Sequence, residues 1–362
     1  MSVAAVEVAR ASAAQVAPAR VALLGTGTVG GAVLARLASW RGSLLGERLS
    51  LVHVANSRSC AGDRHGFFAG DALRRLALAP LGSSLDAVEA ALRGDGPRVL
   101  IDATASEAVA ERHAHWLAQG IHVATACKIG QGTSLPRWRA IRAASRSGDA
   151  CYGDSATVGA GLPLLRSLRE LQDGGDRIHA IAGVLSGSLA WLFNQYDGMR
   201  PFSALVRQAR DAGYTEPDPR DDLSGEDVRR KLLILARTAG VELEAGEVDV
   251  ASLVPAELAI LSKDALDAAL PALDAPLRER FATAYKRGEK LRFIARLQDG
   301  RASVGLESLP ADHPLAGGAG TDNRVAIWSD RYPTQPLVIQ GPGAGAEVTA
   351  AGLLDDVLRF LR

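Results

Sequence analysis

The segment RVALLGTGTVG, from Arg20 to Gly30, predicts a buried strand, a glycine turn and the start of a helix that reaches about Trp40. Glycines at such a turn allow a tight bend and let the backbone approach a pyrophosphate, which binds at the amide-rich start of the helix. Glycine turns also occur where only packing requires them. The position of this one, directly after a strand near the start of a domain, favours a dinucleotide-binding unit.

Three further apolar runs predict parallel strands that complete this unit: Leu49–Ala55, Arg98–Ala103 and Ile121–Ala124. Open α/β sheets bind ligands at the carboxyl ends of their strands. We therefore expect the cofactor beside the glycine turn and the loops that leave these strands. The residues expected to bind it are Gly25, Thr26, Gly27, Thr28, Val29, Gly30, Asn56, Arg58, Thr104, Ala105 and Ser106.

The residues after the second strand bear on the choice of cofactor. Many NAD sites carry an acid here for the ribose hydroxyls, whereas an uncharged residue near an arginine suits the 2′-phosphate of NADP. Asn56 and Arg58 fit the second pattern, so NADP is favoured over NAD. The alternative for Arg58 is a solvated loop arginine.

Composition narrows the class of protein. The chain has 362 residues and a hydrophobic content of 47%, which is enough for two domains and a sizeable core. Its formal net charge of zero gives no indication of a nucleic-acid or membrane partner, and no apolar run is long enough to cross a bilayer. Cys60, Cys127 and Cys151 lack the spacing of metal ligands or disulfides, so we expect a reducing compartment, the cytoplasm.

The first residues, 1–19, are rich in alanine and lack the basic start and compact apolar block of a secretory signal. We expect a disordered tail there, and a transit peptide ranks second.

A second informative stretch, ARDAGYTEPDPRDDLSGEDVRRK, runs from Ala209 to Lys231. Its first half is expected to be held extended by Pro217 and Pro219, because a residue before proline avoids the helical region. Four carboxylates are expected to converge in this half: Glu216, Asp218, Asp221 and Asp222.

The second half of this stretch predicts a helix that begins with a capping box from Ser224 to Asp227. At roughly 100° per residue, Asp227 and Lys231 lie side by side, bordered by Ile234 and Leu235. Arginines are expected to occupy the other, solvent-facing side: Arg229, Arg230 and Arg237. An acid four residues before a lysine is also common as an exposed helix pair. The acidic segment that leads into this helix favours a functional site.

Lysine is rare in this chain, since of 41 basic residues only Lys128, Lys231, Lys263, Lys286 and Lys290 are lysines. A lysine can lose its proton in a protein, whereas an arginine cannot. The lysines that remain are therefore candidates for proton transfer.

The pattern A-x3-G-Y-T-E-P-D-P-x2-D-L-x-G-x-D-x3-K, present from Ala209 to Lys231, resembles the signature of the homoserine dehydrogenase family. Three more segments stand in family order: VGAGLP at 158–163, LSGSL at 185–189 and GAGAEVTAAG at 343–352. The likeness is closest to the dehydrogenase half of the bifunctional aspartokinase/homoserine dehydrogenases. It covers the chain from about Arg20 onward.

The resemblance implies an α/β fold in which a Rossmann-type nucleotide-binding domain accompanies an α+β catalytic and dimerisation domain with a mixed sheet. The expected boundaries are 1–19 for the tail, 20–153 and 341–362 for the dinucleotide-binding domain, and 154–340 for the catalytic and dimerisation domain. Apolar or alternating runs at 291–297, 302–309, 324–328 and 336–340 predict strands of this sheet. The family uses the region to pair two subunits, so we expect a homodimer. An aspartokinase half and a carboxy-terminal regulatory domain are expected to be absent.

The activity implied is the interconversion of L-homoserine and L-aspartate 4-semialdehyde with NAD(P)(H), in threonine and methionine biosynthesis. By resemblance, Glu216 binds the substrate ammonium and Asp227 orients its hydroxyl. The substrate-binding residues expected in full are Glu216, Asp222, Ser188 and Asp227. The catalytic residues expected are Lys231, Lys128 and Asp227, and which lysine exchanges the hydroxyl proton is left open. For Ser188, an ordinary helix cap is the alternative.

Further family sites fall on two loops and one helix. The family's T-P-N-K loop reads T-A-C-K here, so Lys128 keeps its place while Ala126 and Cys127 differ. Lys128, together with Gly345 and Thr349 near the start of the last helix, is expected to touch the cofactor. Backbone carbonyls can hold a monovalent cation such as Na+ in the family, and Ser155 stands where an acid often assists. The carbonyls concerned are those of Val158, Ala160 and Leu162, for which a plain glycine-rich connector is the alternative.

Two other functions compete with this interpretation. One is a different Rossmann oxidoreductase that acts on another amino alcohol or on a sugar. The other is a catalytically silent NADP-binding or regulatory protein of the same fold, which the changed T-A-C-K loop makes conceivable.

Overall fold

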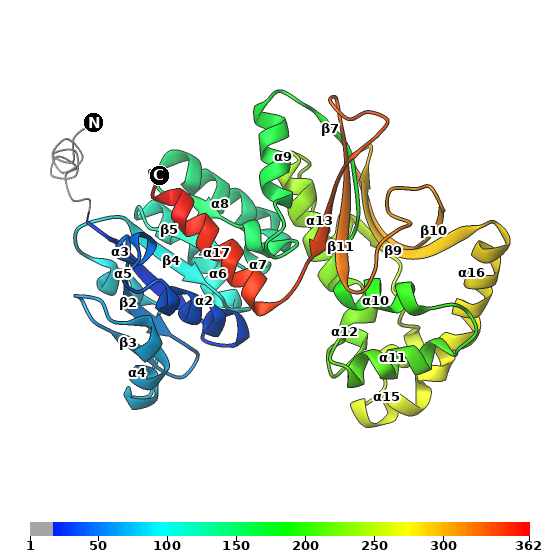
Figure 1. Cartoon of the computed structure of the whole chain (residues 1–362), viewed down its shortest axis with the longest axis horizontal. Coiled ribbons are helices and arrows are strands. Elements are labelled where there is room, and N and C mark those ends of the chain that lie inside the picture. The colour runs from blue at the N-terminus through cyan, green and yellow to red at the C-terminus, as the bar shows by residue number, and fades with distance from the viewer. Residues whose placement is uncertain (1–16) are drawn as a thin grey trace, which may run out of the picture. The chain divides into compact units, whose positions relative to one another are not determined.

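The computed structural model describes residues 17–362, so the expected tail lies outside the described residues except at its end, where Ala19 begins the first strand. The chain divides into two units, which are described separately (Figure 1). Unit 1 holds the described residues up to Thr125 together with Ile141–Gly153 and Leu353–Arg362, and unit 2 holds Ala126–Ala140 and Asp154–Gly352. The expected boundaries placed the segments 126–140 and 341–352 in the dinucleotide-binding domain. In the structure both segments belong to unit 2.

Unit 1 is built on a six-stranded sheet in the order β3-β2-β1-β4-β5-β6. Its strands are β1 (Ala19–Leu24), β2 (Leu49–Ala55), β3 (Cys60–Gly62), β4 (Arg98–Asp102), β5 (His122–Thr125) and β6 (Tyr152–Gly153). All neighbours pair in parallel except β2 and β3. The strand order reverses at β1, which lies between β2 and β4, and ligands bind at such a switch point in doubly wound sheets. The predicted parallel strands are confirmed.

The helices of unit 1 follow its strands. They are α2 (Thr28–Ser39), α3 (Leu44–Glu47), α4 (Ala72–Leu78), α5 (Asp86–Leu92) and α6 (Glu107–Ala118). Two more, α8 (Leu135–Ser147) and α17 (Ala346–Phe360), have their first residues in unit 2 and the rest in unit 1. Fully buried side chains such as Leu23, Leu100 and Trp116 form the core around the sheet.

Unit 2 is built on a second six-stranded sheet, in the order β12-β11-β7-β9-β10-β8. Its strands are β7 (Ile178–Val184), β8 (Val248–Val250), β9 (Glu289–Gln298), β10 (Arg301–Pro310), β11 (Asp322–Ser329) and β12 (Leu337–Pro342). The sheet is mixed, because β8 and β10 pair in parallel and all other neighbours pair antiparallel. The expected mixed sheet is confirmed.

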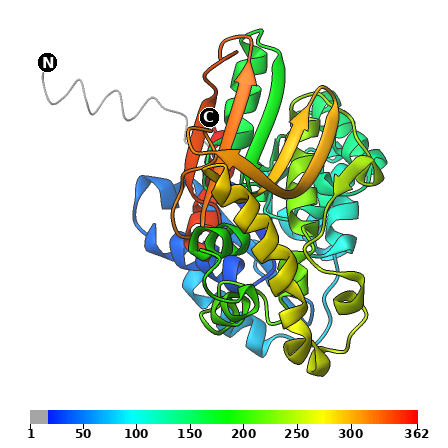
Figure 2. The same ribbon diagram turned by 90° about the vertical axis from the view of Figure 1, so that its right-hand side faces the viewer.

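The helices of unit 2 include α13 (Glu226–Thr238), which packs against both helices and strands. The others are α7 (Ile129–Gly132), α9 (Leu164–Asp173), α10 (Gly187–Gln195), α11 (Phe202–Asp211), α12 (Arg220–Leu223), α14 (Ala256–Ala259), α15 (Lys263–Ala269) and α16 (Asp274–Lys286). Helix α13 contacts α7, α9, β9 and β10, while α16 packs along β9 (Figure 2). The side chains from Leu232 to Leu235 are buried in succession, so α13 is enclosed on every side there.

This enclosure overturns one prediction about α13. Arg237 was expected on a solvent-facing side, but its side chain is buried. The helical period placed it correctly around the axis, but the period cannot show that α7 and the chain after α13 cover that side.

The predicted start of this helix is also wrong. Gly225 occupies the N-cap position with φ +78°, a left-handed conformation that glycine adopts without strain, and the helix begins at Glu226. The Ser224 hydroxyl donates to the carbonyl of Asp221 instead of forming a capping box with Asp227. The preceding acidic segment is not extended throughout, because Pro219 starts the short helix α12. The Asp227 carboxylate is therefore free of a capping role.

Within residues 17–362, none of the helices is long and apolar enough to span a membrane.

Candidate functional site

Asp227 lies between two lysine side chains in unit 2. Lys231, one turn further along α13, places its Nζ 2.8 Å from Asp227 Oδ2. Lys128 places its Nζ 3.4 Å from Asp227 Oδ1. Lys128 is the N-cap residue of α7, which packs against α13. The fold thus brings together the three residues expected to be catalytic.

The Lys231 ammonium is held at a fixed point. Its side chain is only 11% exposed, and Nζ donates a hydrogen bond of 2.8 Å to the carbonyl of Leu185, just before α10. A buried ammonium is tolerated where such partners replace water. Two of its three donor positions face Leu185 and Asp227, so one position remains for another group.

Opposing influences act on the ionisation of Asp227. Burial favours the neutral acid, but the charges of Lys231 and Lys128 and their hydrogen bonds outweigh it and lower the pKa of Asp227 to about 2. The side chain is 42% exposed, so one edge of the carboxylate stays accessible. Asp227 therefore acts as a permanent anion near neutral pH.

Asp222 organises a second part of the site. The Ser188 hydroxyl donates to Asp222 Oδ1 at 2.6 Å, and the backbone N–H of Glu216 donates to Oδ2 at 2.8 Å. Burial raises the pKa of Asp222, and the neighbouring charges of Asp227 and Asp221 add to the effect, although the two hydrogen bonds oppose it. The Glu216 side chain itself is exposed. Asp222 therefore fixes the turn that carries Glu216.

The expected convergence of four carboxylates is wrong. Asp218 forms two hydrogen bonds with the guanidinium of Arg220, at 2.9 and 2.7 Å, which lower the pKa of Asp218. Asp221 is exposed. The sequence pattern treated Arg220 as a spacer, but this arginine neutralises one acid and also donates to the carbonyls of Leu258 and Leu261.

The glycine turn of unit 1 leaves room for a phosphate group. Gly25 has φ +89°, and a Cβ there would lie 2.6 Å from the carbonyl oxygen of Ala103. A Cβ on Gly30 would lie 1.9 Å from the carbonyl oxygen of Gly25. Gly27, the N-cap residue of α2, faces open space and makes no side-chain hydrogen bond to the amides at the start of this helix. The turn therefore fits a pyrophosphate on its amide groups.

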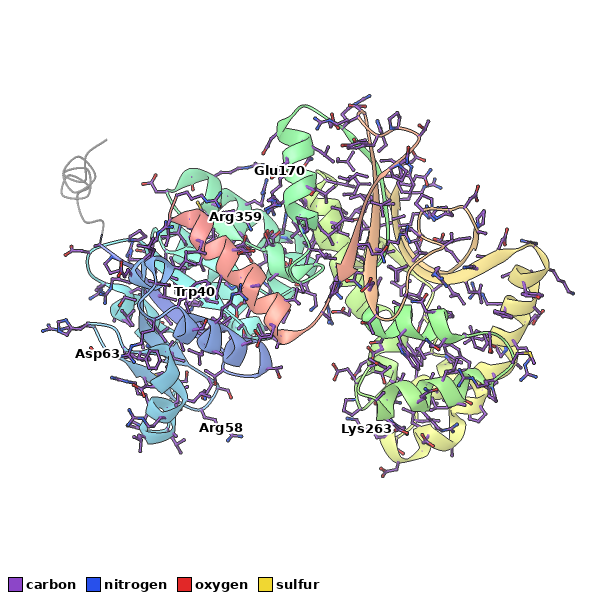
Figure 3. All side chains as sticks on the ribbon, in the orientation of Figure 1. Trp40, Arg58, Asp63, Glu170, Lys263 and Arg359 are labelled. Atoms are coloured by element: carbon purple, nitrogen blue, oxygen red, sulfur yellow. The ribbon has the colours of Figure 1, made fainter. Side chains whose placement is uncertain are left out.

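The loop after β2 presents an arginine. Asn56 Oδ1 accepts hydrogen bonds from the backbone N–H groups of Arg58 and Ser59, at 2.8 and 3.0 Å. Its amide nitrogen lies 3.5 Å from the hydroxyl of Thr26 in the glycine turn. The Arg58 side chain (Figure 3) is exposed and forms no ion pair within residues 17–362. It is available to an anionic ligand.

Sequence reasoning missed a buried network that holds the loop after β4. Asp102 Oδ1 accepts from the backbone N–H and the hydroxyl of Thr104, at 2.9 and 2.7 Å. Its Oδ2 accepts from the Thr125 hydroxyl and is 3.0 Å from His113 Nε2. The Nδ1 of His113 lies 3.0 Å from the hydroxyl of Tyr152. An acid at the end of an otherwise apolar strand was the only signal of this network in the sequence.

Of the remaining residues expected to touch the cofactor, Ala105 and Ser106 lie in unit 1, where Ser106 caps α6, and Gly345 and Thr349 lie in unit 2. Thr349 stays within the start of α17, where its hydroxyl donates to the carbonyl of Gly345 at 2.7 Å. The expected contact of these two residues with a cofactor stays a prediction.

The cation site expected at Val158, Ala160 and Leu162 also stays a prediction. Ala160 has φ +53°. Asp154, next to Ser155, is fully buried, and its Oδ1 lacks a hydrogen-bond partner. In the described part of the chain no group of three His, Cys, Asp or Glu side chains could hold a metal ion, so a cation here would need backbone oxygens.

Comparison with known proteins gives concordant matches. The family model for homoserine dehydrogenase matches residues 163–358, and that for the homoserine dehydrogenase NAD binding domain matches residues 25–152. The bifunctional aspartokinase/homoserine dehydrogenase 2 (chloroplastic) of Zea mays is 45% identical over 266 residues, which are 73% of this chain and 29% of that protein. The chain thus spans less than a third of this bifunctional relative. The homoserine dehydrogenase of Emericella nidulans is 38% identical over 279 residues, which are 74% of this chain and 76% of that protein.

Solved structures agree. A Candida auris protein of unknown function matches with a TM-score of 0.85 and 34% identity, over 94% of this chain and 97% of that one. A putative homoserine dehydrogenase from Archaeoglobus fulgidus matches with a TM-score of 0.75 and 25% identity, over 94% and 98%.

Replacing Asp227 with asparagine should destabilise unit 2 in a pH-dependent manner. The folded-state pKa of Asp227, about 2, lies below the ordinary aspartate value of about 3.9. Its stabilising effect is therefore fully present above about pH 4 and is lost as the pH falls through about 2. Urea unfolding of wild type and Asp227→Asn should show equal differences in unfolding free energy at pH 7 and pH 5, and a smaller one at pH 3. A difference that stays constant down to pH 3 would contradict the assignment.

Proposed function

We propose that this chain, which belongs to the homoserine dehydrogenase family, interconverts L-homoserine and L-aspartate 4-semialdehyde with a nicotinamide cofactor, as part of threonine and methionine biosynthesis. The observation that carries the proposal is the cluster in which Asp227 lies between Lys231 and Lys128. Such a cluster can bind a hydroxyl group and exchange its proton.

Oxidation of an alcohol removes a hydride from carbon and a proton from oxygen. The nicotinamide, when bound, accepts the hydride. The protein must therefore accept the proton, and we assign this role to Lys231. As a neutral amine, Lys231 would keep two N–H groups for Leu185 and Asp227 and direct its lone pair to the third position. In the reverse reduction, the ammonium returns the proton to the oxygen.

The other two members of the cluster prepare the hydroxyl for this transfer. The accessible edge of the Asp227 carboxylate accepts a hydrogen bond from the substrate hydroxyl and so orients it. The Lys128 ammonium, 33% exposed, anchors the opposite carboxylate oxygen and adds positive charge where the alkoxide develops.

The substrate ammonium is assigned to Glu216. Its carboxylate is exposed and forms no ion pair within the described residues, while its backbone is fixed by Asp222. Ser188, bound to the same carboxylate, lies at the start of α10 and can reach the polar end of a small amino alcohol. The separation of Glu216 from Lys231 along the site then selects substrate length, so shortening homoserine to serine should abolish turnover.

Lys231→Ala should lower kcat for homoserine oxidation by on the order of 10³-fold, because the proton acceptor is lost. Steady-state assays at alkaline pH favour oxidation, which releases a proton. Binding of NADP+, followed by fluorescence, should change little. Lys286→Ala, which removes an exposed lysine in the last turn of α16, is the matched control.

Several outcomes of this experiment would overturn the proposal. Near-normal turnover of Lys231→Ala refutes the role of Lys231. Cofactor binding by the wild type without homoserine turnover identifies a silent binding protein. Oxidation of serine at a comparable rate identifies a different oxidoreductase.

We further propose that NADP(H) is preferred to NAD(H). The support is Asn56, which stands where an acid would repel a phosphate, and the guanidinium of Arg58 in the same loop, which forms no ion pair with the described residues. A 2′-phosphate bound there would gain a charge-assisted hydrogen bond.

Arg58→Ala should therefore lower kcat/KM for NADP+ by about 10-fold to 100-fold, the value of a hydrogen bond to a charged group. The kcat/KM for NAD+ should stay nearly constant. Arg64→Ala, at another exposed arginine of unit 1, is the control and should leave both values nearly unchanged. Equal losses for the two cofactors in Arg58→Ala would show that this arginine does not read the phosphate.

We also propose a homodimer in the cytoplasm. The two faces of the unit 2 sheet differ, since Val325 and Ile327 pack into the main core while Ala326 and Trp328 belong to a smaller cluster on the other face. Trp328 is partly exposed there, which suits a subunit interface. Within the described residues no disulfide joins Cys60, Cys127 or Cys151, which suits a reducing compartment.

A further inference from the structure

We infer that Arg237 is a positioning residue that holds Lys128 beside Asp227 by fixing the short helix that Lys128 begins. The inference rests on the proposed function, because it concerns how one member of the proton-transfer cluster is kept in place.

The guanidinium of Arg237 binds three carbonyl groups from two segments. Its Nη1 donates to the carbonyl of Gln131 at 2.6 Å, and its Nη2 donates to that of Thr133 at 2.8 Å. Its Nε and Nη2 also donate to the carbonyl of Leu243, at 3.1 and 2.7 Å. One side chain therefore ties the end of α13 to α7 and to the chain that returns after α13.

The α7 carbonyls need such a partner. The last carbonyl groups of a helix have no N–H partner within the helix, and a basic side chain can supply one. Helix α7 is a single turn, Ile129–Gly132, with Lys128 at its N-cap and Thr133 at its C-cap. An isolated turn of this length is not stable. The bonds from Arg237 to Gln131 and Thr133 therefore cap one end of the turn while Lys128 stands at the other.

A close backbone approach makes this connection stiff. A Cβ on Gly132 would lie 2.8 Å from the carbonyl oxygen of Arg230, so the backbone of α7 rests directly on that of α13. Asp227 and Lys231 are carried by the same helix. A shift of α7 along α13 would therefore change the distance between Lys128 and Asp227.

The charge of Arg237 argues against a role in packing alone. The side chain is buried, its nearest carboxylate oxygen is Glu244 Oε2 at 3.9 Å, and burial lowers the pKa of Arg237. A buried charge is costly, and an apolar residue of similar volume often gives equal or greater stability. The planar fork of an arginine spreads its N–H donors over three nitrogens in a fixed geometry, whereas the donors of a lysine all lie on one nitrogen. The additional role of the Arg237 guanidinium is to fix the position of α7 along α13.

Arg237→Lys keeps the charge and removes the fork, so it tests the inference without emptying the site. We expect kcat for homoserine oxidation to fall by on the order of 10²-fold, the effect of a small misplacement of a catalytic group, with NADP+ affinity unchanged. Arg229→Lys is the matched control, because Arg229 lies on the same helix and donates to Glu226 and to the carbonyl of Ala245, but not to α7. Its kcat should stay within about threefold of wild type.

A double-mutant cycle with Lys128→Ala separates positioning from general damage. If Arg237 acts through Lys128, Arg237→Lys should reduce kcat little further once Lys128 is alanine. If instead the two substitutions lower kcat by factors that multiply in the double variant, Arg237 does not act through Lys128 and the inference is wrong.

Hydrogen exchange supplies a readout that does not depend on turnover. The amides of 129–133 should exchange faster in Arg237→Lys than in wild type or Arg229→Lys. Unchanged protection of this segment would show that Arg237 does not fix α7, even if kcat falls. Full activity of Lys128→Ala, by contrast, would refute the proposed role of Lys128. The hydrogen-exchange result alone would then decide whether Arg237 fixes α7.

Discussion

The site depends on the ion pair between Asp227 and Lys231, one turn apart on a helix that unit 2 encloses. A buried ammonium needs partners that replace water, and Asp227 and the carbonyl of Leu185 supply them. Asp227 in turn stays ionised because the ammonium groups of Lys231 and Lys128 approach its two oxygens. The Asp227 carboxylate and the two lysine ammonium groups thus stabilise each other's charges. The same arrangement leaves one direction at Lys231 Nζ and one edge of Asp227 for a hydroxyl group.

Rigid backbone elements hold this cluster together. Helix α13 fixes Asp227 relative to Lys231, and α7 brings in Lys128 from a segment that belongs to unit 2 although it directly follows strand β5 of unit 1 in sequence. The glycine turn of unit 1 is equally constrained, since no side chain fits at Gly25 or Gly30. The groups that we propose for proton transfer therefore belong to unit 2, and the glycine turn that we propose to bind the cofactor belongs to unit 1.

Local patterns in the sequence predicted much of this arrangement. The strand, glycine turn and helix of unit 1 follow from apolar runs and glycine chemistry, and the pairing of Asp227 with Lys231 follows from their spacing of four. Such local patterns could not predict contacts between segments that are far apart in the sequence. Arg237 is buried against α7, and Asp102 binds Thr125 as well as His113, and both contacts depend on how separate elements pack. The pair of Arg220 with Asp218 is local, but the pattern treated Arg220 as a spacer. Helix α13 begins after the left-handed Gly225 and not after Ser224 as predicted. The Ser224 hydroxyl donates a hydrogen bond to the backbone carbonyl of Asp221 instead of capping the helix.

The central claim is that Lys231 exchanges a proton and does not merely supply a positive charge. Replacement by arginine separates the two roles, since arginine keeps the charge and can still pair with Asp227 but cannot release a proton under physiological conditions. The most direct measurement is kcat for homoserine oxidation by Lys231→Arg with saturating cofactor. Activity reduced as severely as in Lys231→Ala would support the claim, and activity close to that of the wild type would contradict it.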